Sequence, residues 1–511
     1  MTHPLLPLRS APSLFHAPRN TWLLLFLVCS LHFGMGALLG LSVDEAHYAL
    51  YAVHLDWSYF DHPPLVGWAQ WPLVALNAPT WAMRLVPELV WLATALLAYR
   101  LAERLNASTQ PMVPTGQAGL WAVAALALAP LLHVLGIGLL PDTLLMFFSV
   151  ALLGLTWDLM DGNIVRRPLP WVALGAVLGL AGLSKYTAIL AAAAVALCLM
   201  LAHGVAVLRN VWLWMSVAIG LLLVMPVAYW NERNQWISFV YQAQHGAGGG
   251  WQVAHLLRFL VVQLLVYGPL LLWGLAGVPR AQGASPRALL LFFVVPFVVL
   301  AALSGGGTSL PHWTAPAWAA LAPFAGVGLA HAMQNGHRWV IWGLVVVQGL
   351  VSAAALGLML TGGVPLFTGA TGQGNSANPS NPFADLHGWD AAGSRARVLA
   401  EQHGLQSVGV QNWTLASRLG WYASPLPVYV LEDRFDQFDL WAGDLPAGGN
   451  TLFVDWSQLA YMAPIGDNGF TDCTLLETQD VRRLGTTIAT FRFYACHNWS
   501  GQPRPRLRGA S

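Results

Sequence analysis

Runs of about 20 apolar residues recur along this chain and limit its fold more than any other feature does. Hydrophobic residues make up 56% of the 511 residues, and charged residues only 9%. A soluble chain of this length could not cover so much apolar surface, whereas each such run can cross a bilayer as a helix. The sequence therefore predicts an α-helical polytopic membrane protein with about eleven transmembrane helices. The expected spans are residues 20–41, 82–101, 117–135, 141–158, 171–183, 187–203, 211–229, 253–276, 288–303, 313–332 and 339–360.

The arginines near the ends of these spans predict an orientation. Cytoplasmic loops of membrane proteins carry an excess of lysine and arginine. If the N-terminus is cytoplasmic, the loops on that side contain Arg100, Arg104, Arg166, Arg167, Arg209, Arg280, Arg287 and Arg338. The opposite loops contain only Arg233, apart from Lys185 and Arg84 at the membrane edges. We therefore expect a multi-pass protein of the inner (plasma) membrane whose C-terminal region is periplasmic.

Composition divides the chain into three predicted parts. Residues 1–361 form the transmembrane domain, with an amphipathic loop at residues 42–81 on the outer face. Residues 362–386 are rich in Gly, Asn and Pro, which is typical of a linker. Residues 387–511 return to a globular composition and predict a small α/β domain.

Helix and strand patterns alternate in that C-terminal domain. Amphipathic stretches near 390–403 and 413–423 predict helices. The expected strands are Ser407–Gln411, Pro427–Leu431, Thr451–Asp455 and Thr487–Tyr494. Cys473 and Cys496 fall in this region, where a disulfide is expected only if the region is exported, so the sequence leaves their pairing open.

The stretch from Asp44 to Leu65 is unusually rich in ionisable groups for this chain. It follows the first apolar run and contains four carboxylates and three histidines. Asp44, Tyr48 and Tyr51 are spaced four and three residues apart, so a short helix would present them on one face. Two interpretations are open: a solvated loop whose charges keep it out of lipid, or a functional site at the membrane edge.

Other ionisable residues fall on the same predicted side of the membrane. They are Arg84, Asp142, Lys185, His245, Arg258 and His312. Ionisable groups near membrane-spanning helices are functional candidates. A carboxylate that deprotonates a hydroxyl, beside cations that bind a phosphate, would suit group transfer from a lipid phosphate. Individually, Lys185 could instead extend to the interface, Asp142 could cap a helix, and Arg258 could pair with an acid between helices.

The order of several motifs resembles GT-C membrane glycosyltransferases, in the branch of the protein O-mannosyltransferases and the lipid A aminoarabinose transferase. The paired first-loop motifs are similar to Asp44-Glu45-Ala46-His47-Tyr48 and to Tyr59-Phe60-Asp61-His62-Pro63-Pro64. Later motifs of the branch resemble Ser184-Lys185-Tyr186, Trp236 through His245, Pro311-His312-Trp313 and His387-Gly388-Trp389. The resemblance covers the predicted spans and extends to the C-terminal domain.

This resemblance implies roles for individual residues. Asp44 would be the base that activates the acceptor hydroxyl, and Glu45 would support it. Asp61 and His245 would hold a divalent cation such as Zn, Mg or Mn, although two ligands are only half a site and a metal-independent mechanism is the alternative. No cofactor is otherwise implied.

The sequence departs from the branch at two positions. His47 and His62 replace basic residues that would bind phosphate there, and a histidine is cationic only when its pKa is raised. His47 and His62 stay predicted phosphate-binding residues, and we expect Lys185 and Arg258, with Arg84, to bind the phosphate more firmly than they do. Tyr48, Asp142 and His312 complete the predicted substrate site.

The resulting hypothesis is a glycosyltransferase that uses a polyprenyl-phosphate sugar and inverts its anomeric carbon. The acceptor would be a hydroxyl or phosphate on a glycolipid such as lipid A, or on a protein. The alternative is a transporter or flippase of a lipid-linked or small polar substrate, which predicts internal repeats and charges within the spans. The net charge of +1 argues against a nucleic-acid partner.

Overall fold

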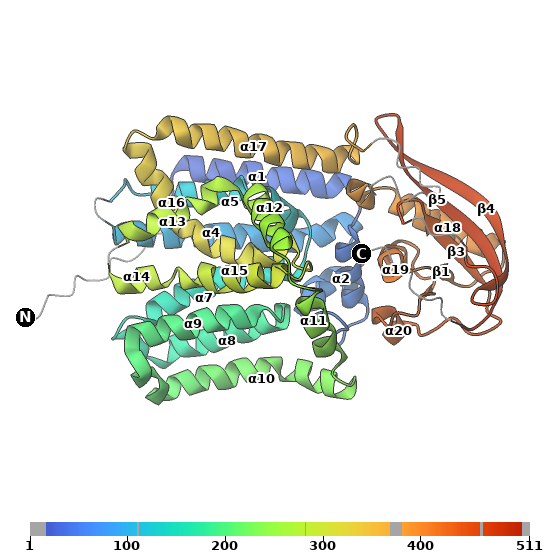
Figure 1. Ribbon diagram of the computed structural model, residues 1–511, viewed down its shortest axis with the longest axis horizontal. Helices are drawn as coiled ribbons and strands as arrows, with labels where there is room; N and C mark the ends of the chain where they lie inside the picture. Colours follow the sequence, from blue (N-terminus) through green and yellow to red (C-terminus); the bar gives the residue numbers. More distant parts are fainter. Residues whose placement is uncertain (1–16, 110–111, 282, 368–380, 460–462, 503–511) are drawn as a thin grey trace, which may run out of the picture. The chain divides into compact units, whose positions relative to one another are not determined.

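The computed structural model describes residues 17–109, 112–281, 283–367, 381–459 and 463–502 (Figure 1). Its α-helices are α1 (Arg19–Leu38), α2 (Val43–Val53), α3 (Leu65–Ala75), α4 (Leu85–Ala107), α5 (Gln117–Ala127), α6 (Pro130–Ile137), α7 (Pro141–Leu159), α8 (Pro168–Ser184), α9 (Ala188–His203), α10 (Val211–Arg233), α11 (Ile237–Ala247), α12 (Val253–Leu272), α13 (Gly274–Gly277), α14 (Ala284–Ala288), α15 (Leu291–Ser304), α16 (Ala315–Gln334), α17 (Arg338–Thr361), α18 (Trp389–Gln402), α19 (Trp413–Tyr422) and α20 (Gln437–Trp441). Short 3-10 helices are η2 (Thr80–Arg84), η3 (Ile164–Arg166), η4 (Gly204–Arg209), η5 (Val278–Arg280), η6 (Pro311–Thr314) and η7 (Pro382–Leu386). The strands are β1 (Val408–Val410), β2 (Val428–Val430), β3 (Thr451–Trp456), β4 (Phe470–Arg483) and β5 (Thr486–Trp499).

The chain divides into two compact units. The first comprises Met1–Gly34, Asp61–Val66 and Arg84–Ala353, and the second comprises Met35–Phe60, Gly67–Met83 and Ala354–Ser511. The predicted domain boundaries at residues 361 and 386 stay predictions. Residues 368–380 of the predicted linker lie outside the described residues.

The prediction of a helical membrane protein is confirmed, and each of the eleven expected spans contains a helix. Within the described ranges, eight helical segments are long and apolar enough to cross a membrane, or nine if the bent pair α5 and α6 forms one span. Helix α8 is apolar but shorter, and α16 is not among these segments. The number of crossings and the cytoplasmic N-terminus therefore stay predictions.

Helix α16 lies at the centre of the first unit. Every residue from Ala315 to Ala332 is buried, and the helix packs against α4, α5, α7, α13 and α15. Its small residues allow this close approach: a Cβ on Gly326 would lie 2.2 Å from the Ala118 carbonyl oxygen. In lipid, helices associate mainly through van der Waals packing, because the hydrophobic effect does not drive them together. Small residues at the interface permit this packing by letting the backbones approach closely.

The second unit contains a five-stranded mixed sheet, of which β1, β3, β4 and β5 are labelled in Figure 1. Its strand order is β2-β1-β3-β5-β4. Strand β1 pairs in parallel with β2 and β3, while β5 pairs antiparallel with β3 and β4. Parallel neighbours need a crossover, and α19 supplies the one between β1 and β2. Leu484 and Gly485, both at positive φ, join β4 to β5, as a two-residue hairpin turn requires.

Strands β1, β2, β3 and β5 and helices α18 and α19 confirm the predicted elements of this domain. Strand β4 was not predicted, because it is an edge strand with many exposed polar residues and lacks a clear apolar face. Cys473 and Cys496 lie opposite each other on β4 and β5 and form a disulfide.

Candidate active site

The second unit presents Asp44 in the first turn of α2. Ser42 precedes this helix and caps it: its hydroxyl accepts a hydrogen bond from the Glu45 amide at 3.4 Å, and the Glu45 carboxylate accepts one from the Ser42 amide at 2.9 Å. This reciprocal capping box explains why the helix begins here. The buried Glu45 carboxylate is thus part of the cap, whereas the neighbouring Asp44 is half-buried.

His47 lies one turn further along α2 and is buried among aromatic rings. The Ser417 hydroxyl donates its proton to the Trp413 carbonyl oxygen at 2.7 Å, so His47 donates from Nδ1 to Ser417 at 3.0 Å. The rings of Tyr48 and Tyr51 lie 5.8 Å and 5.1 Å from the His47 ring. The predicted helix carrying Asp44, Tyr48 and Tyr51 is therefore present as α2.

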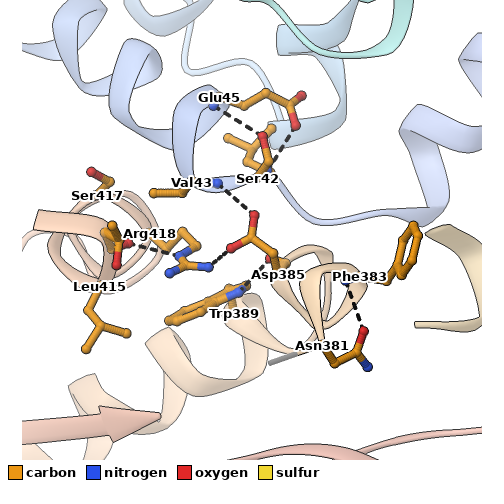
Figure 2. A network of polar contacts seen from close by, with 12 residues as sticks. Ser42, Val43, Glu45, Asn381, Phe383, Asp385, Trp389, Leu415, Ser417 and Arg418 are labelled. Atoms are coloured by element: carbon orange, nitrogen blue, oxygen red, sulfur yellow. Dashed lines mark hydrogen bonds and ion pairs between the residues drawn. The ribbon is translucent and has the colours of Figure 1, made fainter. Parts of the chain in front are cut away.

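A second polar network contacts the start of α2 and was missed by the sequence analysis (Figure 2). Asp385 accepts a hydrogen bond from the Val43 amide at 3.1 Å and forms an ion pair with Arg418 of α19. The Arg418 guanidinium lies 3.9 Å from the centre of the Trp389 ring and 4.8 Å from that of Trp456. Asp385 stands two residues before the His387-Gly388-Trp389 motif, which was the only sequence signal for this region.

Asp436, the residue before α20, is an acidic group near His47. Asp436 caps this helix by accepting a hydrogen bond from the Phe438 amide at 2.7 Å. Burial raises the pKa of Asp436 to about 7, and the nearby His47 acts in the opposite direction. The sequence analysis did not single out this residue.

The first unit brings together three of the predicted site residues. The Lys185 ammonium donates to both carboxylate oxygens of Asp142 at 2.7 Å, and His312 lies 3.7 Å from the same carboxylate. Lys185 follows the last residue of α8, and Asp142 lies in the first turn of α7 after Pro141. The Lys185 ammonium also lies 5.3 Å from the centre of the Trp313 ring.

His312 is a neutral member of this cluster. Burial lowers its pKa to about 4, and this effect exceeds the opposing influence of the Asp142 carboxylate. At neutral pH, the positive charge of the cluster therefore resides on Lys185, whose ammonium is paired with the Asp142 carboxylate.

A pocket of about 270 Å³ opens beside Arg258 in the first unit. It is lined by His255, Arg258, Phe259, Val262, Ser304, Gly307, Thr308, Ser309, Leu310 and Pro311. The hydroxyl oxygens of Thr308 and Ser309 are buried, with no hydrogen-bond partner among the described residues. A cation and two unsatisfied hydroxyls are a suitable set for an oxyanion, which accepts several hydrogen bonds at once.

The remaining predicted site residues are Arg84, Asp61, His62 and His245. Arg84 is buried at the end of η2, and the Asp61 carbonyl oxygen accepts a hydrogen bond from Gln242 of α11. Asp61 and His62 are half-buried. The side chain of His245 lies outside what the structure describes. No three His, Cys, Asp or Glu side chains within the described part gather as a metal site would require, so the metal at Asp61 and His245 stays a prediction.

A chain of buried polar side chains inside the first unit was also missed. His32 Nδ1 lies 2.7 Å from the Glu88 carboxylate, and its Nε2 lies 2.8 Å from His133 Nδ1. Both histidines interrupt apolar runs, which was the available signal. Buried polar groups among apolar helices require such partners because no water satisfies them.

Together, these features define the class of the protein: a multi-pass helical bundle with a small α/β domain and polar clusters at helix ends. The predicted resemblance of the chain to GT-C membrane glycosyltransferases is confirmed by the family profile, a relative and solved structures. The profile of the family described as dolichyl-phosphate-mannose-protein mannosyltransferase matches residues 61–230. The lipid A galacturonosyltransferase RgtD of Rhizobium johnstonii is 27% identical over 290 residues, which cover 54% of this chain and 58% of the length of RgtD.

Solved structures of ArnT from Cupriavidus metallidurans share the fold. The apo structure is 18% identical with a TM-score of 0.57, and the match covers 92% of this chain and 97% of ArnT. The structure bound to undecaprenyl phosphate is 17% identical with a TM-score of 0.58, and the match covers 93% and 98% of the two chains. The similarity thus includes both the helical bundle and the C-terminal sheet domain.

Proposed function

We propose that this chain transfers a sugar from a polyprenyl phosphate to a glycolipid acceptor of the lipid A kind, at the outer face of the inner membrane. The names of RgtD and of undecaprenyl-phosphate-bound ArnT support the acceptor and the donor class, respectively. The profile match to a lipid-phosphate-dependent mannosyltransferase family supports the same donor class.

The observation that carries the proposal is the Arg258 pocket. Arg258, Thr308 and Ser309 are among the residues that line it, and the two hydroxyls have no hydrogen-bond partner among the described residues, so a small rearrangement would let all three bind a phosphate group. Lys185 is a second source of positive charge, and it is held by Asp142 in the described structure. A donor phosphate would compete with Asp142 for Lys185, because both anions need the same ammonium.

In the proposed reaction, an acceptor hydroxyl oxygen attacks the anomeric carbon of the donor sugar. The new C–O bond forms as the bond from that carbon to the phosphate oxygen breaks, and the bonding electron pair leaves with the phosphate. The hydroxyl proton passes to the carboxylate of Asp44, and attack from the opposite face inverts the anomeric carbon. The leaving phosphate is stabilised by Lys185 and Arg258 and needs no general acid.

The test is sugar transfer by the purified protein in vesicles that contain lipid A. The donors would be undecaprenyl phosphate linked to galacturonic acid, to aminoarabinose or to mannose, with mass spectrometry of lipid A as the readout. The proposal expects one donor to add a sugar mass to lipid A, and expects Arg258→Ala to reduce this transfer at least about 10-fold.

Two further arms of the experiment separate the alternatives. Transfer to a serine-containing peptide but not to lipid A would overturn the acceptor assignment. Movement of the donor across sealed vesicles without any transfer would favour the flippase and overturn the proposal.

A further inference from the structure

Arg418 is a buried charge that the proposed reaction does not yet use. Its side chain is 1% exposed, and its Nε donates to the Thr414 carbonyl oxygen at 3.0 Å. The guanidinium lies between Trp389 and Trp456 and pairs with Asp385. Burying an arginine is costly unless it is paired and hydrogen-bonded, and a stacked guanidinium is held in one orientation.

Asp385 uses its two oxygens to connect separate elements. One oxygen pairs with Arg418 on α19, and the other accepts the hydrogen bond from the amide of Val43, the first residue of α2 (Figure 2). A carboxylate at a helix N-terminus satisfies an amide that has no partner within the helix and complements the helix dipole. Asp385 therefore fixes the start of α2 at the residue immediately before Asp44.

The arrangement also places charges around Asp44. Arg418 from α19 contributes a positive charge, while Asp385 from η7 and Glu45 on α2 itself contribute negative ones. His47 lies one turn further along α2, and its charge acts on Asp436, the residue that caps α20. Burial lowers the pKa of Arg418 to about 9, and the Asp44 carboxylate acts to raise it. Such an interaction is reciprocal, so Arg418 favours the ionised form of Asp44.

We infer that Arg418 and Asp385 form a clasp that positions Asp44 for proton abstraction and places a positive charge near it. This inference rests on the proposed function, because it assigns Arg418 and Asp385 as positioning residues for the base of that reaction. Arg418 holds Asp385 in place and offsets its negative charge. Asp385 in turn holds the first turn of α2.

The clasp makes an unusual prediction about the two residues. Removing the positive charge of Arg418 leaves Asp44 near the carboxylates of Asp385 and Glu45, which raises the pKa of Asp44. Removing the negative charge of Asp385 leaves the positive charge of Arg418 less compensated, which lowers the pKa of Asp44. A purely structural role would reduce activity in both variants without moving the pH dependence in opposite directions.

The experiment is the pH profile of kcat/KM for sugar transfer to lipid A, using whichever undecaprenyl-phosphate sugar the wild type accepts. Arg418→Gln should move the acidic limb upward by about one pH unit, and Asp385→Asn should move it downward by a similar amount. Arg418→Lys, which retains the charge but not the stacked fork, should lose about 10-fold in kcat with little shift of the limb.

The matched control is Arg395→Gln. Arg395 belongs to the same unit and pairs with Glu477 at 2.6 Å, but both side chains are 35% exposed, and the pair connects α18 to β4. This variant should retain the wild-type profile. Size-exclusion chromatography in detergent reports whether each variant folds, and Arg418→Lys and Asp385→Asn keep the test decisive if Arg418→Gln does not fold.

The outcomes are separable from those of the proposed function. Opposite shifts in the two variants support the clasp. Two results overturn the clasp while the transferase assignment stands. In the first, both variants are active with the wild-type pH profile. In the second, the acidic limbs of Arg418→Gln and Asp385→Asn move in the same direction. A wild type that transfers no sugar overturns the proposed function, and the catalytic role of the clasp with it.

Discussion

The two units each bury a cation against a carboxylate, and the two pairs are built differently. In the first unit, Lys185 contacts Asp142 through a single ammonium group, near the neutral ring of His312. In the second, Arg418 is stacked between two tryptophans, and its partner Asp385 also holds a helix N-terminus. A lysine is a flexible point charge that can exchange one anion for another, whereas a stacked arginine is fixed in geometry.

This difference suggests a division of roles. The lysine pair is suited to a site where an incoming phosphate replaces a resident carboxylate. The arginine pair is suited to a permanent frame that holds Asp44 of α2 in one place.

The largest effect is expected from Asp44→Asn, which removes the base but keeps the size of the side chain. General-base catalysis contributes about 10²–10⁴-fold, so kcat should fall by that factor. Glu45→Gln should cost much less, because a glutamine oxygen can still accept the hydrogen bond from the Ser42 amide that completes the cap. Comparable losses in both variants would show that the acid of the cap, and not Asp44 alone, takes part in proton transfer.

The lysine pair should separate stability from activity. Lys185→Met leaves Asp142, whose side chain is 1% exposed, as an unpaired buried charge. Breaking a buried pair in this way costs about 3–5 kcal/mol, and replacing both partners by apolar residues removes most of that cost. The double variant Lys185→Met/Asp142→Leu should therefore melt near the wild type while remaining inactive in transfer. Recovery of activity in the double variant would contradict a role for Lys185 in binding phosphate.

The disulfide distinguishes the second unit from the first, whose described cysteines, Cys29 and Cys198, are free thiols. Replacing Cys473 and Cys496 together by serine should lower the free energy of unfolding by about 2–4 kcal/mol, because the unfolded chain is no longer cross-linked. Thermal unfolding with and without reductant measures the effect. The wild type should lose stability on reduction and the double variant should not; an equal response would contradict the assignment.

The smallest effect is expected from Asp436→Asn. The pKa of Asp436 is raised to about 7 in the fold, against about 3.9 in an unfolded chain. Below about pH 4 the group is neutral in both states, and as the pH rises from 4 to 7 the unfolded state ionises first, so the folded state loses stability. The asparagine variant avoids this loss and should be about 1–3 kcal/mol more stable at pH 8 but unchanged at pH 4.

Chemical denaturation at the two pH values checks this prediction. Asp467→Asn, at an exposed position of the same unit, is the matched control and should show no gain at either pH. A gain of equal size at pH 4 and pH 8 would point to better packing and contradict the ionisation account.

The sequence predicted the elements whose patterns are local. Apolar runs located the long helices, and the spacing of Asp44, Tyr48 and Tyr51 predicted α2. It also singled out Lys185, Asp142 and His312, because ionisable residues at the ends of apolar runs are conspicuous. Their mutual contacts, however, depend on α7, α8 and η6 packing together, which no local pattern specifies.

The clasp could not be predicted for the same reason. Arg418 occupies an amphipathic helix, where an arginine is ordinarily solvated, and Asp385 lies within the segment 362–386 that was read as a linker. Only the packing of Trp389 and Trp456 around the guanidinium shows that this arginine is buried. The acidic group Asp436 is similar, since its raised pKa arises from burial and not from sequence spacing.

The most direct test of the division of roles is to measure donor binding and turnover separately. Binding of undecaprenyl phosphate to the purified protein can be followed by native mass spectrometry for the wild type, Lys185→Ala and Asp44→Asn. The account predicts that Asp44→Asn binds the lipid phosphate as the wild type does but transfers sugar at least about 100-fold more slowly, and that Lys185→Ala binds it at least about 10-fold more weakly. If Asp44→Asn weakens binding as much as Lys185→Ala does, or if Lys185→Ala binds normally, the division of roles between the two buried pairs is wrong.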